Sequence, residues 1–182
     1  MKTDGRCASS WANAAASAVE GAYFIQNGHL PELSTQQLID CDHFSKGCHG
    51  GLFTNAFAYA EHYPLMGETD YPFVGVTQPC HYDDSVEHHG GVSHYINVLP
   101  NDIEQLMIAV KMGPVAASVS AGAKSFQFYR SGIITDTACA EFPVDSAVLI
   151  VGYGIENDHA YWLIKNSWGT SWGEDGYAKI AM

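Results

Sequence analysis

The chain of 182 residues is 47% hydrophobic and carries a formal net charge of −12 at pH 7, from eight Lys and Arg against 20 Asp and Glu. This length and apolar content suffice to bury a core, as one compact unit or as two small lobes. The negative field repels phosphate groups and anionic lipids, which argues against nucleic acid as a partner. No apolar run approaches the roughly 18 residues of a membrane helix, and the N-terminus lacks the pattern of a signal peptide, so we expect no membrane span.

The first predicted helix is an unbroken, alanine-rich run from Ser10 to Gln26. Alanine has the highest intrinsic helix propensity, and Ser9 or Ser10 can serve as the N-cap. Asn27-Gly28 can serve as the C-cap, because both residue types tolerate the left-handed conformation. We expect a helix of about four turns with its N-terminus at Ser10.

Two further helices are predicted before residue 63. In the segment LSTQQLIDC, Ser34 and Gln37 have the spacing of a capping box and Leu33 can act as its hydrophobic staple, which indicates a short second helix. A glycine-rich turn at 47–51 precedes the third helix. The apolar face of this third helix is predicted from residues at helical spacing: Phe53, Ala56, Phe57 and Ala60.

Residues 64–95 contain prolines, glycines and isolated tyrosines without a period, which predicts irregular chain held by cysteine rather than disorder. The character of the sequence changes near Val92, and we therefore divide it into a helical lobe of residues 1–92 and a β-rich lobe of residues 93–182. One more helix is expected early in the second lobe, with Asn101 as its cap and with an apolar face at Ile103, Leu106, Met107 and Val110.

After Pro114 the sequence is typical of strands. Five short segments are rich in β-forming residues and are separated by turn residues: VAASVSA, FQFYRSGII, AVLIVGYGI, AYWLIKNSW and YAKIAM. They predict an antiparallel half-barrel. Together with the helices of the first half, they place the fold in the α+β class.

The sequence has five cysteines, at positions 7, 41, 48, 80 and 139, and none of them forms a CxxC pair. Disulfides are therefore favoured over zinc or redox chemistry, and the odd number leaves one thiol without an intrachain partner. Another cluster could suggest a metal site, but its spacing matches no zinc or calcium pattern and we interpret it as solvated loop: His81, Asp83, Asp84, His88 and His89. No metal and no cofactor is expected.

Residues 4–21, DGRCASSWANAAASAVEG, resemble the start of the central helix of papain-family (C1-type) cysteine peptidases, in which a Q-G-x-C-G-S-C-W-A-F run carries the nucleophile. Four later motifs resemble the family's landmarks in the same order: STQQLIDC, GCHGG, GPVAASVSA and YWLIKNSWGTSWGEDGY. The resemblance spans almost the whole chain and favours the cathepsin L-like branch over the cathepsin B-like one. It implies a papain-like two-lobed fold, with a helical N-terminal lobe and an antiparallel, barrel-like C-terminal lobe.

The resemblance also implies the site residues, of which three are altered. Ser10 occupies the place of the nucleophilic cysteine, and Ser146, in VDSAV, occupies the place of the histidine base. Asp4 stands where the family has an oxyanion-binding glutamine and offers only acceptors, while Asn166 is retained. A papain-type cysteine works as a thiolate beside an imidazolium, whereas a serine hydroxyl needs a base to take its proton. Asp145 adjoins Ser146 but should face the opposite side of its strand.

By the same resemblance, the expected disulfides are Cys7 with Cys48 and Cys41 with Cys80. Cys139 is left over, because its partner in relatives lies beyond the Asn-bearing motif. We expect the chain to be truncated at both ends relative to the family, so that the β-rich lobe lacks bordering strands. An equally weighted alternative is that the sequence is a fragment or comes from an incomplete gene model. Disulfides favour a lysosomal or extracellular location, which no signal peptide in the sequence supports directly.

The predicted function is that of a catalytically inactive papain-like pseudopeptidase that binds a peptide or protein partner, as a decoy or regulator would. Its groove would be lined by His49, Gly50, Gly51 and Trp168. A second hypothesis is a structural subunit in an assembly that completes the truncated β-rich lobe. A third is a converted peptidase or hydrolase that uses Ser10, which the missing histidine disfavours.

Overall fold

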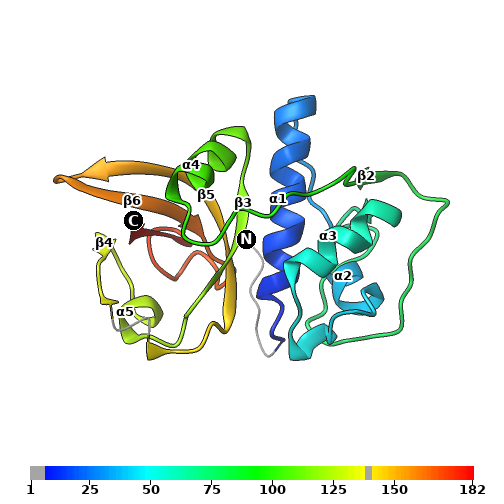
Figure 1. The fold of residues 1–182 in the computed structure, drawn as a ribbon. Helices are drawn as coiled ribbons and strands as arrows, with labels where there is room; N and C mark the ends of the chain where they lie inside the picture. Colours follow the sequence, from blue (N-terminus) through cyan, green and yellow to red (C-terminus); the bar gives the residue numbers. More distant parts are fainter. Residues whose placement is uncertain (1–6, 138–140) are drawn as a thin grey trace. The chain divides into compact units, whose positions relative to one another are not determined.

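The computed structural model describes residues 7–137 and 141–182, and the chain forms two compact units (Figure 1). One unit ends at Asn97 and is called the helical lobe, and the other runs from Val98 to Met182 and is called the β-lobe. The division falls a few residues beyond the one placed at residue 92 from the sequence. Asp4 and Cys139 lie outside the described residues. None of the described helices is long and apolar enough to cross a membrane.

The longest helix of the helical lobe, α1, spans Ser10–Asn27 and begins at the predicted residue. Ser9 holds the N-cap position, and its hydroxyl accepts a hydrogen bond from the Asn13 amide at 3.1 Å. Gly28 closes the helix in the left-handed conformation, with φ of 78°, and donates its N–H to Phe24 O, which confirms the predicted C-cap. The alanines of the first turns are buried, so neighbouring elements can approach the α1 backbone closely.

Helix α2, Thr35–Cys41, is buried along its entire length. Ser34 caps it, since its hydroxyl accepts from Gln37 N at 3.0 Å. The reciprocal half of the predicted capping box is wrong. Ser34 N donates to Met66 O, and the Gln37 amide instead bonds Tyr59, Pro64 and Met66. A buried amide forms hydrogen bonds wherever the surrounding fold offers partners, and here the partners lie outside the helix.

Helix α3, Phe53–His62, follows the 3₁₀ turn η1, Gly47–His49. Its apolar face is as predicted, because Ala56 and Ala60 are buried and the two phenylalanines pack beside them. The segment after α3 was expected to be irregular throughout. It contains instead a short antiparallel pair, β1 (Leu65–Met66) with β2 (His88–Gly90). A Cβ on Gly90 would lie 2.5 Å from the Leu65 Cβ, so this close strand approach requires glycine.

Two disulfides confirm the expected pairing in the helical lobe, Cys7 with Cys48 and Cys41 with Cys80. The second bridge anchors the segment 71–80, which has no regular secondary structure, to the end of α2. The prediction that cysteine holds this irregular chain in place is therefore confirmed.

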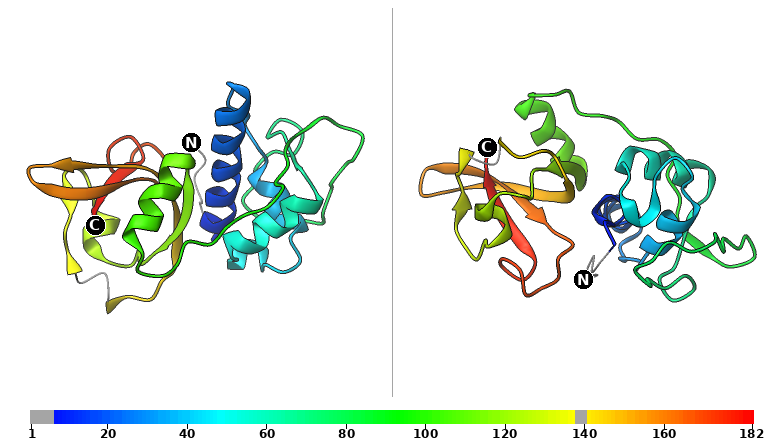
Figure 2. Two further views of the ribbon diagram at one scale, coloured as in Figure 1. Left: turned by 45° about the horizontal axis from the view of Figure 1, so that its top comes forward. Right: turned by 90° about the horizontal axis from the view of Figure 1, so that it is seen from below.

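The sheet of the β-lobe has the order β3-β5-β6-β7-β4. Its strands are β3 (Val115–Val119), β4 (Ile133–Ile134), β5 (Ser146–Glu156), β6 (His159–Lys165) and β7 (Tyr177–Ala181). The long hairpin of β5 and β6 is visible in all views (Figure 2). All pairings are antiparallel except that of β4 with β7, which is parallel, so the wholly antiparallel expectation is wrong at this edge.

Helix α4, Ile103–Met112, is capped by Asp102 and not by Asn101 as predicted. The Asp102 carboxylate accepts from Gln105 N at 2.8 Å, while Asn101 adopts a left-handed φ of 61° in the preceding turn. The apolar face is also one residue shorter than expected. Leu106, Met107 and Val110 pack on the core, but Ile103 is 49% exposed.

The predicted strand FQFYRSGII is largely wrong, because helix α5 (Lys124–Gln127) replaces its first part and only β4 remains. In a strand, Phe126 and Phe128 would share one face. Here Phe126 and Tyr129 are buried together, three residues apart, and Phe128 is 73% exposed. Packing of this pair against Trp172 overrides the β-propensity of the aromatic residues.

Candidate functional site

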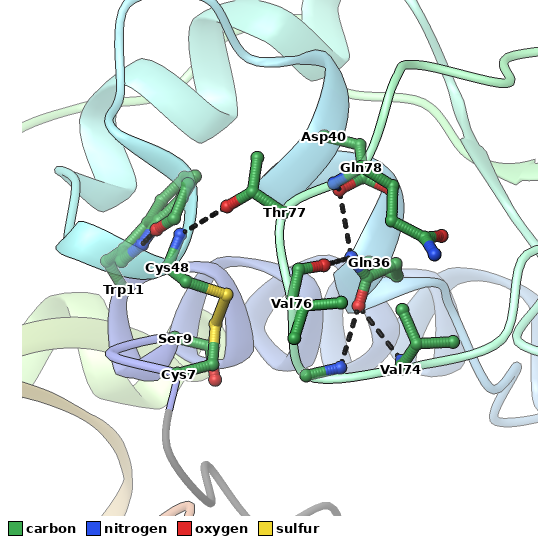
Figure 3. Close-up of a disulfide and its surroundings, with 12 residues drawn as sticks. Cys7, Ser9, Trp11, Gln36, Asp40, Cys48, Val74, Val76, Thr77 and Gln78 are labelled. Carbon is green, nitrogen blue, oxygen red and sulfur yellow. Dashed lines mark hydrogen bonds between the residues drawn. A yellow bond between two sulfur atoms is a disulfide. The ribbon is translucent and has the colours of Figure 1, made fainter.

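The first group of site residues lies at the N-terminus of α1, within the helical lobe. Ser10 is the first helical residue and is half-buried. Trp11 is 2% exposed and donates its ring N–H to Gly47 O at 3.3 Å. Ala8 N donates to Cys48 O at 3.0 Å, next to the Cys7–Cys48 disulfide. These ties hold the segment leading into Ser10 against the turn of residues 47–51 (Figure 3).

The two glycines predicted to bind a peptide differ in what their backbone offers. Gly50 donates its N–H to Gly47 O at 3.2 Å, and its carbonyl accepts from Lys46 N at 2.8 Å. Gly51 uses neither its N–H nor its carbonyl in any hydrogen bond within the described residues. A Cβ on Gly51 would lie 2.7 Å from the Trp11 ring, so only glycine fits there. Of the two glycines, Gly51 is therefore the one whose N–H remains available to an extended peptide.

The second group lies in the β-lobe, at one end of β5 and β6. Ser146 begins β5, is half-buried and pairs with Val119 of β3. The Asp145 carboxylate accepts from Ala121 N at 2.7 Å, which agrees with the expectation that it turns away from the face of Ser146. Asp145 is therefore already bonded within its own lobe.

Asn166 follows β6 directly and is 2% exposed. Its Oδ1 accepts from Ser167 N at 2.8 Å, whereas its Nδ2 is buried and has no hydrogen-bond partner among the described residues. Since Leu149 pairs with Lys165, Asn166 lies opposite Val148, and Ser146 is two residues along the same face. The two positions therefore share one side of the sheet. A buried donor without an acceptor is rare and calls for an explanation.

The comparisons with known proteins agree with one another across the whole chain. The model of the papain family cysteine proteases matches residues 1–182. The chain belongs to the papain family. It is 42% identical over 191 residues to cathepsin L2 of Homo sapiens and 41% identical over 188 residues to cathepsin J of Mus musculus. Each alignment covers 100% of this chain and 56% of the relative. It spans about half the length of the curated relatives it matches.

A solved structure of the papain family confirms the fold. The crystal structure of the Carica candamarcensis cysteine protease CMS1MS2 in complex with E-64 matches with a TM-score of 0.92 and 35% identity, over 100% of this chain and 82% of that one. The predicted papain-like α+β fold, with its cathepsin L-like relatives, is therefore correct.

Trp168, the remaining predicted groove residue, belongs to an aromatic cluster of the papain-like β-lobe. Its ring meets those of Phe126 and Trp172 edge-on, at centroid distances of 5.4 and 5.6 Å. The Trp172 ring N–H donates to Phe126 O at 3.1 Å. Trp168 and Trp172 therefore pack against the core of the lobe, while a role of Trp168 in a groove stays a prediction. His49 is exposed at the end of η1.

The segment 81–89, interpreted from the sequence as solvated loop, contains an aromatic stack. His88 stacks on Tyr82 with 5.1 Å between ring centroids. Burial raises the pKa of Tyr82 to about 12, with a further contribution from its hydrogen bond to Asp84. Among the residues that the structure describes, no three His, Cys, Asp or Glu side chains gather as metal ligands.

Sequence reasoning missed two residues beside this site of the papain fold, Gln36 and Thr77. Both act across a long stretch of sequence, because Gln36 bonds residues 74–76 and Thr77 bonds Cys48. Thr77 lies in a segment without a period, and no local pattern marks such a contact. For Gln36 the sequence does contain a signal, the polar run STQQ in a short helix between apolar residues. The polar side chains of a buried helix must find hydrogen-bond partners elsewhere in the fold.

Proposed function

We propose that this papain-family chain does not hydrolyse peptides and instead binds an extended polypeptide at the turn of residues 47–51. The observation that carries the proposal is the buried Asn166 Nδ2, which has no acceptor among the described residues, on the same face of the sheet as Ser146. In the family resemblance, the histidine base would occupy position 146, and a serine there removes the imidazole that a retained asparagine would orient.

Among the described residues of the β-lobe, no histidine lies near Asn166 to replace the base. By sequence, His159 is its one histidine, and it lies exposed at the start of β6 opposite Glu156. Asn166 is seven residues further on, which corresponds to roughly 20 Å along an extended strand. His159 therefore cannot replace the missing imidazole unless the hairpin unfolds.

The proposed binding mode uses the backbone of Gly51. Its N–H and carbonyl are not used within the described residues, and one side of the glycine rests on Trp11 and Ser45. An extended peptide that bonds both groups would pair with the turn as an added strand does. Such pairing needs main-chain groups on the partner and tolerates many side chains, so a peptide or protein partner is expected.

A hydrolytic assay tests the loss of activity. The natural chain and the variants Ser10→Ala and Asp4→Gln/Ser10→Cys/Ser146→His are incubated with a fluorogenic peptide substrate. We expect no turnover by the first two and measurable turnover by the third, whose side chains restore a nucleophile, a base and an oxyanion donor. Turnover by the natural chain that Ser10→Ala abolishes would show instead a converted serine hydrolase. Stoichiometric labelling of Ser10 by a fluorophosphonate would support the same conclusion.

A binding assay tests the peptide site. A library of blocked, fluorescein-labelled peptides of about eight residues is titrated against the isolated chain by fluorescence anisotropy. Saturable binding supports the proposal. If the isolated chain instead aggregates, and is stabilised only by another subunit, the structural role becomes the better explanation.

Apolar surface in the β-lobe favours the structural role as the second candidate. Ile108 and Met112, one turn apart on the outer side of α4, are 60% and 75% exposed. A structural subunit would cover them against a partner protein. The lysosomal or extracellular location is likewise a proposal, supported by the two disulfides and by the cathepsin relatives. Recovery of the natural protein with both disulfides intact from a secretory compartment would test it.

A further inference from the structure

We propose that Thr77, held in place by α2, is a positioning residue for peptide binding at Gly51. The inference rests on the proposed binding function and extends it to residues that touch no peptide. Figure 3 shows the contacts, which run from Gln36 and Asp40 through the segment 74–78 to Cys48.

The first step is the buried amide of Gln36, which is 0% exposed. Its Nε2 donates to Val76 O at 2.7 Å and to Asp40 Oδ1 at 2.9 Å. Its Oε1 accepts from Val74 N at 3.0 Å and from Gly75 N at 3.3 Å. Both donors and both lone pairs of the amide are used, so Gln36 fixes three consecutive residues of a segment without regular structure.

Asp40, one turn further along α2, fixes the other side of Thr77. Its Oδ1 also accepts from Gln78 N at 2.8 Å, and its Oδ2 accepts from the Tyr71 hydroxyl at 2.9 Å. The residues on both sides of Thr77 are therefore bonded to buried side chains of one helix. Hydrogen bonds to a buried carboxylate are stronger than neutral ones, which makes this anchor rigid.

The second step is the contact of Thr77 with the turn. Thr77 Oγ1 accepts from Cys48 N at 2.9 Å. Gly47, which precedes Cys48, has φ of 57°, and a Cβ there would collide with the Thr77 Oγ1. The threonine hydroxyl thus takes the space next to Gly47 and satisfies the Cys48 amide.

The third step leads from Cys48 to the peptide site. Cys48 is bonded to Cys7 by the disulfide, and its carbonyl accepts from Ala8 N. Gly50, two residues further on, is closed onto Gly47 and Lys46 by backbone hydrogen bonds, so the turn moves as one piece. The direction of the Gly51 N–H and carbonyl is therefore set by where Thr77 holds Cys48.

The test compares Thr77→Val, which keeps the shape of the side chain and removes the acceptor, with Thr77→Ser, which keeps the hydroxyl. Thr69→Val is the matched control, since Thr69 is exposed and makes no hydrogen bond among the described residues. Amide exchange of Cys48, His49 and Gly50, whose N–H groups are all hydrogen-bonded, is followed by NMR in the free proteins, and affinity for the labelled peptide library is measured by anisotropy.

We expect Thr77→Val to speed exchange of these amides and to weaken peptide affinity roughly tenfold, the effect of about one hydrogen bond, while Thr77→Ser and Thr69→Val stay within about twofold of the natural chain. Exchange in α1 and α3 should not change, which separates local loosening from loss of the fold. Unchanged exchange or unchanged affinity in Thr77→Val would overturn the positioning role. Equal acceleration in α1 and α3 would overturn it too, as a merely structural effect.

The two proposals fail in distinguishable ways. If the natural chain binds no peptide of the library, the proposed function is wrong, and the exchange data still decide whether Thr77 fixes the turn. If the natural chain binds but Thr77→Val binds equally well, the function stands and the positioning role is wrong.

Discussion

Each lobe is stabilised internally by a different kind of interaction. Among the described residues, both disulfides lie in the helical lobe. Its buried polar side chains lie at the start of α1 and in or beside α2: Ser9, Asn13, Ser34, Thr35, Gln36, Gln37, Asp40 and Asp42. The β-lobe buries only Asn166 and Ser167 among its described polar residues. Its core is a cluster of aromatic and aliphatic side chains on one sheet. The helical lobe should therefore respond to redox and hydrogen-bond changes, and the β-lobe to changes of side-chain volume.

The largest expected effect is that of Trp172→Ala in the β-lobe. The Trp172 ring packs on Phe126 at 5.1 Å, on Trp168 at 5.6 Å and on Tyr129 at 5.7 Å. Its removal leaves a cavity at the centre of this cluster, and we expect a loss of about 3–5 kcal/mol in the free energy of unfolding. Urea denaturation measures the loss, and hydrogen exchange should locate it in the β-lobe. Equal loss of protection in both lobes would show that they unfold as one unit.

A slightly smaller effect is expected from Cys41→Ala/Cys80→Ala in the helical lobe. The bridge closes a loop with a sequence separation of 39, so its removal should cost about 3–4 kcal/mol through the entropy of the unfolded chain. Thermal unfolding with and without reductant checks this value. The β-lobe serves as the internal control, and its exchange rates should not change. A double variant as stable as the natural chain would show that the Gln36 and Asp40 hydrogen bonds hold residues 71–80 without the bridge.

The loss of stability at alkaline pH should involve one buried tyrosine in each lobe. Burial raises the pKa of both Tyr71, in the helical lobe, and Tyr129, in the β-lobe, to about 12, with Asp40 and Glu174 as additional causes. The neutral phenol is favoured in the folded state. The contribution to stability is therefore complete below pH 10, the ordinary value, and is lost as the pH rises towards 12.

Tyr71→Phe and Tyr129→Phe assign this titration to a lobe. Each should remove part of the fall in unfolding free energy between pH 10 and about 12, as followed by urea denaturation and by tyrosinate absorbance. If both variants keep the full alkaline fall, other groups cause it, and burial of these two phenols is not the reason.

The smallest effect is expected at the candidate site. Ser146→His places a possible acceptor on the face that carries the Asn166 Nδ2, and satisfying that donor should raise the free energy of unfolding by about 1 kcal/mol. Ser146→Ala is the matched control and should change stability by less than about 0.5 kcal/mol. Chemical denaturation measures both. A histidine variant less stable than the alanine variant would mean that the imidazole does not reach Asn166.

Local sequence patterns predicted most of the elements because the deciding contacts are local. The start of α1 at Ser10 and its end at Gly28 follow from capping, and the face of α3 follows from spacing. The errors arise where distant packing decides. Asn101 and Asp102 are both competent caps, and only the turn before α4 selects between them. Phe126 has high strand propensity but lies in α5 because Trp172 is its neighbour.

The site could be predicted only in part for the same reason. The family motifs place Ser10 and Ser146 at the starts of α1 and β5, and the structure has them there. The sequence GCHGG does not show that Gly50 and Gly51 differ in their free backbone groups. This difference depends on which N–H and carbonyl groups are hydrogen-bonded within the turn itself. Thr77 was missed because it meets Cys48 across 29 positions of the chain.

Helix α2 has no residue on the surface, although four of its seven residues are polar. Saturation mutagenesis should therefore find no permissive position in it, whereas ordinary surface helices accept most substitutions on one side. Engineered tags, labels and crosslinkers belong on the outer side of α4, where Ile108 and Met112 are open. In a library of substitution variants selected for folded protein, residues 35–41 should be the longest segment in which almost every substitution is lost.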